Sequence, residues 1–336
     1  MKIVKKLSYF SNDEQKMLEY SQYIGLKILT AMIKLMHQIY RRYLMKKFLS
    51  LVLAILTIGA MVTITPVKAE EASDKVFKIG AIPDFDASEL EEGFGDFAEK
   101  LSEDLGMDVE FVPTVDYVSL VSAFERGEID LAWFGGLTGV QARALVEEAE
   151  AFAQRPSDEK FKSVFIVNTE VEGIEKLADL KGHTFTFGSE SSTSGHLMPR
   201  YFMNKEGINP EEDLNGAANY SGSHDKTYKL VEAGSFETGA VNMQYWDKAV
   251  EDGKVDDSKV KEFYRTDEFY DYNWTINNVD EKFGEGTKDK VKEFVLGLKK
   301  DDTIMMELLD AEEFIETEND NYKQIEEVAK ELGLIQ

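Results

Sequence analysis

Residues 184–195 read Thr-Phe-Thr-Phe-Gly-Ser-Glu-Ser-Ser-Thr-Ser-Gly, and apolar residues recur at helical spacing directly after them. The stretch predicts a strand that passes through a short hydroxyl-rich turn into a helix. Because the first turn of a helix carries unpaired N–H groups and a partial positive charge, Ser and Thr hydroxyls at such a junction can surround the oxygens of an anion. An ordinary N-cap explains the same residues equally well, since Ser and Thr favour that position.

The same alternation of strand and helix extends outward from this junction. Before it, strands are predicted over 76–82, 109–112, 129–134 and 163–167, with helices over 90–105, 117–124 and 137–145. After Gly173 the pattern restarts, with strands over 184–187, 238–241 and 260–264 and helices over 193–205, 224–232 and 245–250. This order indicates an α/β fold with parallel strands and helices on the sheet faces.

A last strand over 273–276 is followed only by helical patterns. Two α/β units with a helical tail predict two lobes and a return crossing of the chain. We expect the first lobe to comprise 76–166 and 275–336, and the second lobe to comprise 167–274.

Composition narrows the class of protein. The chain has 336 residues, 43% of them hydrophobic, with a formal net charge of −26. This acidic balance argues against a nucleic-acid partner, although a local cluster of N–H and O–H donors can still bind a small anion. The absence of cysteine excludes disulfides, thiolate metal sites, a cysteine nucleophile and a lipid-anchored lipoprotein.

The N-terminal region has the pattern of an export signal. Met45-Lys46-Lys47 precedes an uncharged stretch over 48–67, and Val67-Lys68-Ala69 places small residues where a signal peptidase cleaves. We expect a signal peptide over 45–69, cleaved after Ala69, and a periplasmic protein. A permanent membrane span fits the length of the apolar stretch as well, but the small-residue site favours cleavage. Residues 1–44 are interpreted as a misassigned extension, with an amphipathic anchor as the alternative.

Removing this region makes the charge more extreme. The first 69 residues contribute eleven basic and three acidic side chains to the chain's net charge of −26, so the remainder is near −34. Such a surface favours a soluble monomer that avoids anionic membranes.

Ligands in open α/β sheets bind beyond the carboxyl ends of strands, and this rule selects several loops. In the first half they are 83–88, Asp116-Tyr117 and the turn that begins with Gly135 and Gly136, whose backbone N–H groups can approach a ligand closely. In the second half they are 192–194, 221–225 and 242–244. His224 lies in one of these loops, where an imidazole can donate a hydrogen bond to an oxyanion, although a lone histidine is as often a capping or core residue.

Catalytic and cofactor motifs are missing. No Gly-x-Ser-x-Gly sequence surrounds a serine, and the four histidines are isolated from one another. Gly93-Phe94-Gly95 lies inside a predicted helix, so it is not a dinucleotide fingerprint, and Glu147, Glu148 and Glu150 are interpreted as a solvated helix face. We therefore expect no catalytic residues, no metal and no cofactor.

At this point the chain resembles a known family. The residues that carry the likeness are Asp116-Tyr117, the segment 127–136, Ser192-Thr193-Ser194-Gly195 with Pro199 and Tyr201, the segment 222–225, and Tyr270-Asp271-Tyr272-Asn273-Trp274. Together they resemble the phosphonate/phosphite-type (PhnD-like) periplasmic binding proteins, which are the solute receptors of ABC importers. The likeness covers essentially all of the region after the signal peptide, and the segments 133–142 and 188–195 look closest to a selenate-binding subgroup.

The resemblance implies a type II periplasmic binding protein fold. Its two lobes would each be a mixed, mostly parallel sheet flanked by helices, hinged by two crossing strands. The protein would bind phosphite, phosphate, an alkylphosphonate or selenate between the lobes and deliver it to an ABC permease and ATPase. A sensing module for a membrane kinase and an enzyme on the same scaffold are the alternatives.

The resemblance also assigns roles to single residues. Ser192, Thr193 and Ser194 would hold the anion's oxygens, Tyr117 would donate from the first lobe, and His224 and Asp271 would complete the cage. Asp271 would either accept a hydrogen bond from a protonated ligand oxygen or orient His224. Gln244 and Phe161 stand where members that recognise an amino group have a glutamate and an aromatic hydroxyl, so an aminophosphonate is disfavoured, since an ammonium would lack its counter-ion.

Overall fold

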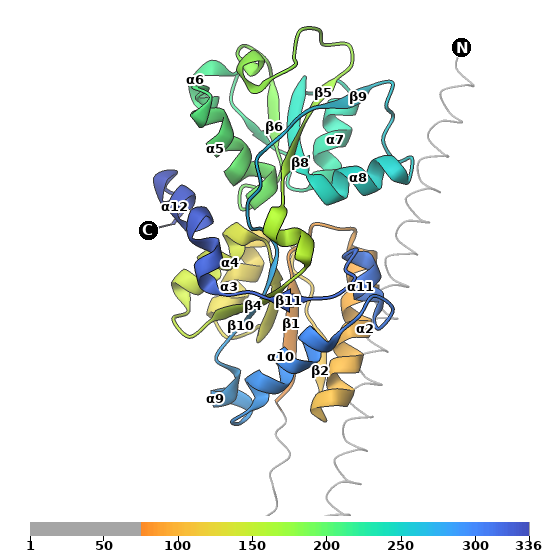
Figure 1. Cartoon of the computed structure of the whole chain (residues 1–336), viewed down its shortest axis with the longest axis vertical. Helices are drawn as coiled ribbons and strands as arrows, with labels where there is room; N and C mark the ends of the chain where they lie inside the picture. Colours follow the sequence, from red (N-terminus) through yellow and green to blue (C-terminus); the bar gives the residue numbers. More distant parts are fainter. Residues whose placement is uncertain (1–74, 336) are drawn as a thin grey trace, which may run out of the picture. The chain divides into compact units, whose positions relative to one another are not determined.

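The computed structural model describes residues 75–335, so the predicted signal peptide and the predicted extension at 1–44 lie outside the described residues. The described chain belongs to one compact unit, Ser73–Gln336, and contains two separate β-sheets with helices packed against each (Figure 1). None of the described helices is long and apolar enough to cross a bilayer.

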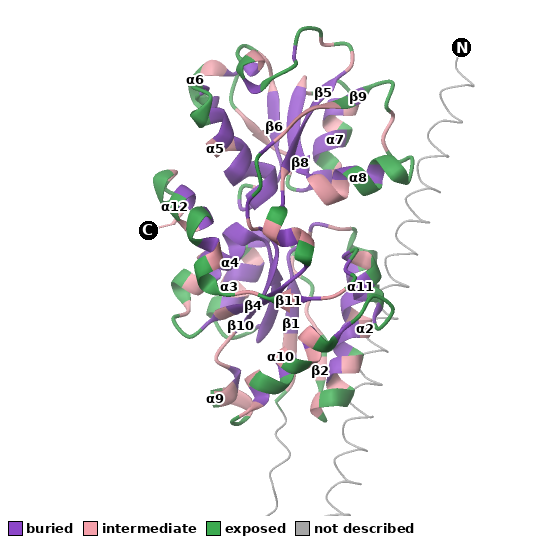
Figure 2. Cartoon of the chain, in the orientation of Figure 1, coloured by how far each residue is buried: buried purple, intermediate pink, exposed green. Residues whose placement is uncertain are grey.

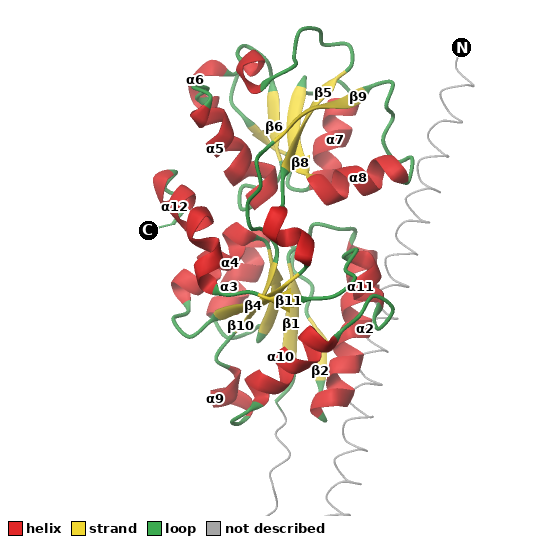
Figure 3. Ribbon diagram, in the orientation of Figure 1, coloured by secondary structure: helices red, strands yellow, loops and turns green. Residues whose placement is uncertain are grey.

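The first sheet has six strands in the order β11-β4-β10-β3-β1-β2 (Figure 3). We call this sheet and its helices the first lobe. Its strands are β1 (Phe77–Ala81), β2 (Val109–Phe111), β3 (Leu131–Phe134), β4 (Glu150–Gln154), β10 (Asn273–Ile276) and β11 (Ile315–Glu316). Its helices are α2 (Ala87–Leu105), α3 (Tyr117–Glu125), α4 (Gly136–Leu145), α9 (Val279–Phe283), α10 (Thr287–Gly297), α11 (Ile304–Leu308), the short η4 (Asn319–Tyr322) and α12 (Lys323–Glu331).

The second sheet has five strands in the order β7-β6-β8-β5-β9, and with its helices it forms the second lobe. Its strands are β5 (Ser163–Asn168), β6 (Phe185–Phe187), β7 (Asn219–Tyr220), β8 (Thr238–Asn242) and β9 (Val260–Arg265). Its helices are η2 (Leu177–Leu180), the π-helical turn η3 (Thr193–Leu197), α5 (Met198–Lys205), α6 (Pro210–Asp213), α7 (His224–Glu232) and α8 (Met243–Glu251). In both lobes the inner strands are mostly buried, and the edge strands are largely half-buried or exposed (Figure 2).

Helix α2 shows how sequence pattern produces these elements. Leu90, Phe94, Phe97 and Leu101 recur at helical spacing and are all buried against the sheet and the helices α10 and α11. At its start the carboxylate of Asp86 accepts a hydrogen bond from the backbone N–H of Ser88 at 2.9 Å. At its end Gly106 has a φ of 66°, which a residue with a side chain rarely adopts.

The sheets are mixed, as predicted, but they are not mostly parallel. Only two of the five strand pairs in the first sheet and two of the four in the second run parallel. The predicted helix face at Glu147, Glu148 and Glu150 is also wrong, because α4 ends at Leu145 and Glu150 begins β4. The carboxylate of Glu150 forms ion pairs with Lys288 and Lys292 of α10.

Two segments carry the chain between the lobes: the first crossing, 155–162, and the second crossing, 266–272. The boundaries predicted after 166 and after 274 differ from these, because the whole of β5 pairs in the second sheet and the whole of β10 pairs in the first. The resemblance implies two crossing strands, but neither crossing is a regular strand. The first contains the short helix η1 (Pro156–Lys160), and the two pair through an isolated bridge between Phe161 and Phe269.

Candidate functional site

The N-terminus of α4 contacts the second lobe and the second crossing. The backbone N–H of Gly136 donates to Asp271 Oδ1 and that of Leu137 donates to Thr193 Oγ1, each at 2.9 Å. A Cβ atom added to Gly135 would lie 3.3 Å from Thr193 Oγ1 and 3.4 Å from Asp271 Oδ1. Glycine therefore allows this close approach, and the structure brings four of the predicted site residues together.

The hydroxyl-rich turn begins the π-helical segment η3 rather than a regular helix over 193–205. Ser192, Thr193 and Ser194 are all buried, and Ser192 Oγ accepts a hydrogen bond from the backbone N–H of Gly195 at 2.9 Å. Single π-turns widen a helix and are frequent at functional sites. His196 holds this turn, because its Nδ1 lies 2.6 Å from the carbonyl oxygen of Glu190 and its Nε2 accepts a hydrogen bond from Arg200 Nε at 3.0 Å.

His224, the first residue of α7, is held in one tautomer. The backbone N–H of Asn242 donates to His224 Nδ1 at 3.3 Å, so the proton of the neutral ring is on Nε2. Burial lowers the pKa of His224 to about 4, which keeps the imidazole neutral at pH 7. Nε2 is buried and has no hydrogen-bond partner within residues 75–335. His224 therefore presents an uncharged N–H donor.

Nine buried side-chain N and O atoms lack a partner among the described residues, and two more of them belong to predicted site residues: the hydroxyl of Tyr117 and Oδ2 of Asp271. Burial, followed by the charges of Asp84, Asp271 and Asp225, raises the pKa of Tyr117, so this hydroxyl keeps its proton. Burial raises the pKa of Asp271 to about 7, against the opposing effect of the hydrogen bond from Gly136.

The three unpartnered atoms of predicted site residues come from three different parts of the fold: α3 of the first lobe, α7 of the second lobe and the second crossing. Buried polar groups in proteins are nearly always paired, and unpaired ones point to a missing partner. Two of these atoms are neutral donors and one belongs to a carboxyl group that titrates near neutrality. Such a set can surround the oxygens of a small oxyanion, with the carboxyl accepting from an oxygen that carries a proton.

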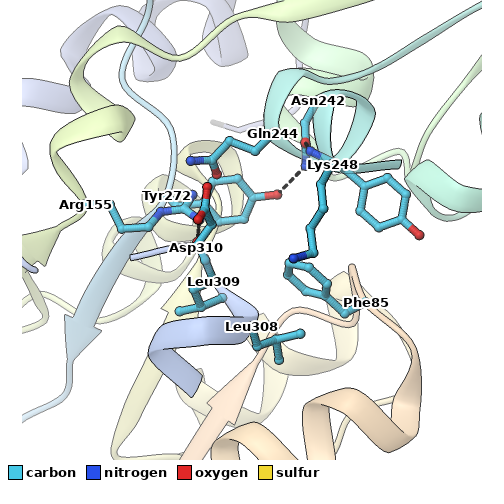
Figure 4. Close-up of a pocket in the computed structure, with 10 residues that line it drawn as sticks. Phe85, Arg155, Asn242, Gln244, Lys248, Tyr272, Leu308, Leu309 and Asp310 are labelled. Carbon is cyan, nitrogen blue, oxygen red and sulfur yellow. Dashed lines mark hydrogen bonds between the residues drawn. The ribbon is translucent and has the colours of Figure 1, made fainter. Parts of the chain in front are cut away.

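The remaining two predicted residues, Phe161 and Gln244, are engaged with other groups. Phe161 is fully buried in the first crossing, where its ring packs against those of Phe269 and Tyr272. Gln244 donates through Nε2 to Ser157 Oγ at 2.9 Å. It lines a small cavity of about 30 Å³ beside the crossings, together with residues of both lobes (Figure 4).

Sequence reasoning missed three polar residues beside this site: Asp84, Tyr272 and Asn242. They form one hydrogen-bonded chain, in which Tyr272 donates to Asp84 Oδ2 at 2.7 Å and Asn242 Nδ2 donates to the Tyr272 oxygen at 2.9 Å. Burial raises the pKa of Asp84 to about 6. The loops 83–88 and 242–244 are predicted ligand-binding loops because they follow strands, but nothing in the sequence indicates that these side chains meet.

An open groove lies between the lobes near this site. It is lined by residues 83 and 85–89 and 114–116 of the first lobe, and by Tyr228, Tyr245 and neighbouring residues of the second. No group of three or more His, Asp or Glu residues within 75–335 could hold a metal ion. The two lobes, the groove between them and the unpaired polar atoms contributed by both lobes and a crossing are typical of a binding protein for a small solute.

Comparisons with known proteins place this binding protein in a family. The profile of the family described as "ABC transporter, phosphonate, periplasmic substrate-binding protein" matches residues 79–322. The chain therefore belongs to the phosphonate-type periplasmic substrate-binding proteins of ABC transporters, as its sequence motifs predict. Members of this family are transport receptors rather than enzymes, and they work with the permease and ATPase of their transporter.

Two relatives and one solved structure are similar to this chain over more than half of its length. A probable ABC transporter phosphite binding protein, PhnD1, of Prochlorococcus marinus (strain MIT 9301) is 39% identical over 79% of this chain and 92% of its own length. The structure of PhnD1 in complex with methylphosphonate has a TM-score of 0.74 and covers 78% of this chain and 99% of PhnD1. The phosphate-import protein PhnD of Mycolicibacterium smegmatis is 25% identical over 59% of this chain and 64% of its own length. Membership in a selenate-binding subgroup stays a prediction.

Proposed function

We propose that this receptor binds a small tetrahedral oxyanion that carries a proton, of the phosphite, phosphate or alkylphosphonate class. The anion is held by Tyr117, Ser192, Thr193, Ser194, His224 and Asp271, with Gly135 and Gly136 allowing the close approach of α4. The observation that carries this proposal is the state of Asp271: Oδ1 is engaged by the N–H of Gly136, and Oδ2 is buried without a partner among residues 75–335.

The donors and the acceptor of the site match the hydrogen-bonding groups of a protonated oxyanion. Tyr117 and His224 offer O–H and N–H donors to two anion oxygens, and an ionised Asp271 offers an acceptor to a protonated ligand oxygen. Sulfate and selenate carry no proton, so above pH 7, where Asp271 is ionised, their oxygens would face its carboxylate without a hydrogen bond. Leaving buried charged groups unpaired is costly, and the site therefore discriminates against sulfate and selenate. The names of the similar proteins, which refer to phosphite, phosphate and methylphosphonate, support the same class.

An aminophosphonate fits less well. The Gln244 side chain is neutral and donates to Ser157, so it offers no counter-ion to an ammonium group. Phe161 carries no hydroxyl, and its ring is committed to packing against Phe269 and Tyr272. A buried ammonium at this end of the site would be unpaired, which is costly.

We also propose that the exported protein is cleaved after Ala69 and is a monomer without a lipid anchor. Cleavage after Ala69 would release an acidic protein with no cysteine for lipid attachment. The net charge near −34 of the remaining chain favours a monomer, because like-charged copies repel one another.

The test is a titration of the purified protein after unfolding and refolding, which removes any retained ligand. Calorimetry with phosphite, phosphate, methylphosphonate, sulfate, selenate and selenite should show binding of the phosphorus oxyanions and none of sulfate or selenate. In Asp271→Asn the amide oxygen keeps the Gly136 N–H, so the amide N–H₂ faces the ligand and replaces an acceptor by donors. This variant should lose the phosphorus oxyanions and gain affinity for sulfate or selenate.

Asp130→Asn is the matched control, because Asp130 is also a buried carboxyl, but it pairs with Lys282 in the first lobe. It should keep the selectivity of the unaltered protein. Equal loss of every anion in Asp271→Asn, or no change, would contradict the assigned role of Asp271. Failure of the unaltered protein to bind any of these anions would contradict the proposed ligand class.

A further inference from the structure

The hydrogen-bonded side chains of Asn242, Tyr272 and Asp84 have no role in the anion site proposed above, although all three are buried. The dashed line in Figure 4 marks the contact between Asn242 and Tyr272. Asp84 lies directly beyond β1 of the first lobe, Asn242 ends β8 of the second, and Tyr272 is the last residue of the second crossing. The hydrogen bonds therefore link both lobes and the crossing.

The direction of these hydrogen bonds is fixed. The backbone N–H of Tyr245 donates to Asn242 Oδ1 at 2.6 Å, so the amide group turns its Nδ2 toward Tyr272. The phenol has one proton, and it goes to Asp84 Oδ2 at 2.7 Å. Its oxygen then accepts from Asn242. Asp84 thus makes Tyr272 an acceptor toward the second lobe.

Tyr272 is packed as part of the first lobe. Its ring stacks on Trp133 of β3, with centroids 5.5 Å apart and planes 15° from parallel. The guanidinium of Arg155 lies 4.8 Å from the ring centroid on Tyr272, and Asn273, the next residue along the chain, begins β10. The hydrogen bond from Asn242 to Tyr272 is therefore a bond between the lobes, and its partner on the first-lobe side is rigidly supported.

Asn242 also determines how His224 is presented. Its backbone N–H is the donor to His224 Nδ1, and its side chain caps the first turn of α8. One residue thus joins the interlobe hydrogen bond to the imidazole that offers Nε2–H to the anion.

We infer that the hydroxyl of Tyr272 is a positioning group: between Asp84 and Asn242 it clasps the two lobes together and holds His224 in place as a donor. It does so without touching the anion through its hydroxyl. The clasp rests on the proposed function only for its effect on anion affinity, since its effect on the arrangement of the lobes can be measured without a ligand.

The kinetic test compares Tyr272→Phe with the unaltered full chain, using methylphosphonate and phosphate as probes. Phenylalanine keeps the ring on Trp133 and Arg155 but leaves Asp84 and Asn242 without their shared partner. The dissociation rate should rise by roughly ten- to a hundredfold, the effect of unpairing buried polar groups, whereas the association rate should change by less than about threefold. The matched control is Thr238→Val, which removes a buried hydroxyl that donates to the carbonyl oxygen of Thr184 at 2.7 Å within the second lobe. It should leave both rates unchanged.

The second test measures the arrangement of the lobes directly. The chain contains no cysteine, so Glu92→Cys on α2 and Glu251→Cys on α8, both at exposed positions, give one label per lobe. In ligand-free protein Tyr272→Phe and Asp84→Ala should lengthen the label-to-label distance, and Asp84→Asn, which keeps an acceptor for the phenol, should restore it.

The outcomes separate the two hypotheses. If the unaltered protein binds neither probe, the proposed ligand is wrong, and the label distances still decide the clasp. An unchanged distance in Tyr272→Phe, or an unchanged dissociation rate where the unaltered protein binds, overturns the clasp. So does an Asp84→Asn variant that behaves like Asp84→Ala.

Discussion

The pKa of Asp271 makes the stability of the ligand-free protein depend on pH in a defined window. Burial raises this pKa from 3.8 to about 7, so between these values the folded protein binds a proton that the unfolded chain does not. Stability therefore falls as the pH rises through this window and becomes independent of Asp271 above it. The slope is about 1.4 kcal/mol per pH unit, and the total loss is at most about 4 kcal/mol.

The perturbation that isolates this contribution is Asp271→Asn. The variant cannot ionise, while its amide oxygen can still accept from Gly136, so the variant should gain up to about 4 kcal/mol relative to the unaltered protein between pH 4 and pH 8. Urea unfolding of ligand-free protein, followed by the fluorescence of its three tryptophans, measures the difference at each pH. Asp84→Asn should behave alike, but its window should end near pH 6, where the raised pKa of Asp84 lies. A difference between Asp271→Asn and the unaltered protein that does not vary with pH would refute the reasoning.

Three other perturbations have expected outcomes. His224→Phe should weaken anion binding roughly ten- to a hundredfold by removing an N–H donor to a charged ligand, and His224→Gln should recover part of the loss; calorimetry that finds no change in either variant would exclude His224 from the site. Raising the salt from about 10 mM to about 1 M shortens the Debye length from about 30 Å to about 3 Å and should speed anion association in stopped-flow mixing, because the net charge near −34 of the chain after Ala69 repels anions; a slower association would indicate steering by a positive patch instead. Arg155→Met should cost about 3–5 kcal/mol of unfolding free energy, because it leaves the buried Asp158 unpaired, and the double variant with Asp158→Leu should recover most of it; an equal loss in the double variant would contradict this account.

Much of the fold follows from local signals in the sequence. The spacing of Phe94, Phe97 and Leu101 predicts α2, and the strand over 184–187 and the turn after it appear as β6 and η3. These signals succeed because the residues that create the pattern are the ones that form the buried face. The comparisons confirm the family that the motifs indicate.

Elements defined by distant partners escaped prediction. Strand β4 is short, begins with Glu150 and contains Ala151-Phe152-Ala153, and it is a strand only because β10 and β11 pair with its two edges. The antiparallel direction of β10 follows from the return of the chain from the second lobe, which no local pattern encodes. For this reason the expectation of mostly parallel sheets was wrong.

The candidate site likewise contains one part that local sequence signals predict and another part that depends on distant partners. The turn at Gly135 and Gly136 and the turn that contains Thr193 could be singled out because each follows a predicted strand, and the structure places them in contact. The pairing of Asp84 with Tyr272 could not be predicted, because a single carboxylate or phenol in a loop carries no spacing signal, and their hydrogen bond forms only where the first lobe and the second crossing meet.

The most direct test of the account is a crystal structure of the protein with phosphite or methylphosphonate bound. We expect the anion within hydrogen-bond distance of the Tyr117 hydroxyl, His224 Nε2 and Asp271 Oδ2, three of the nine buried side-chain atoms that lack a partner within residues 75–335. An anion bound elsewhere, or bound between the lobes with these three atoms still unpaired, would contradict the account.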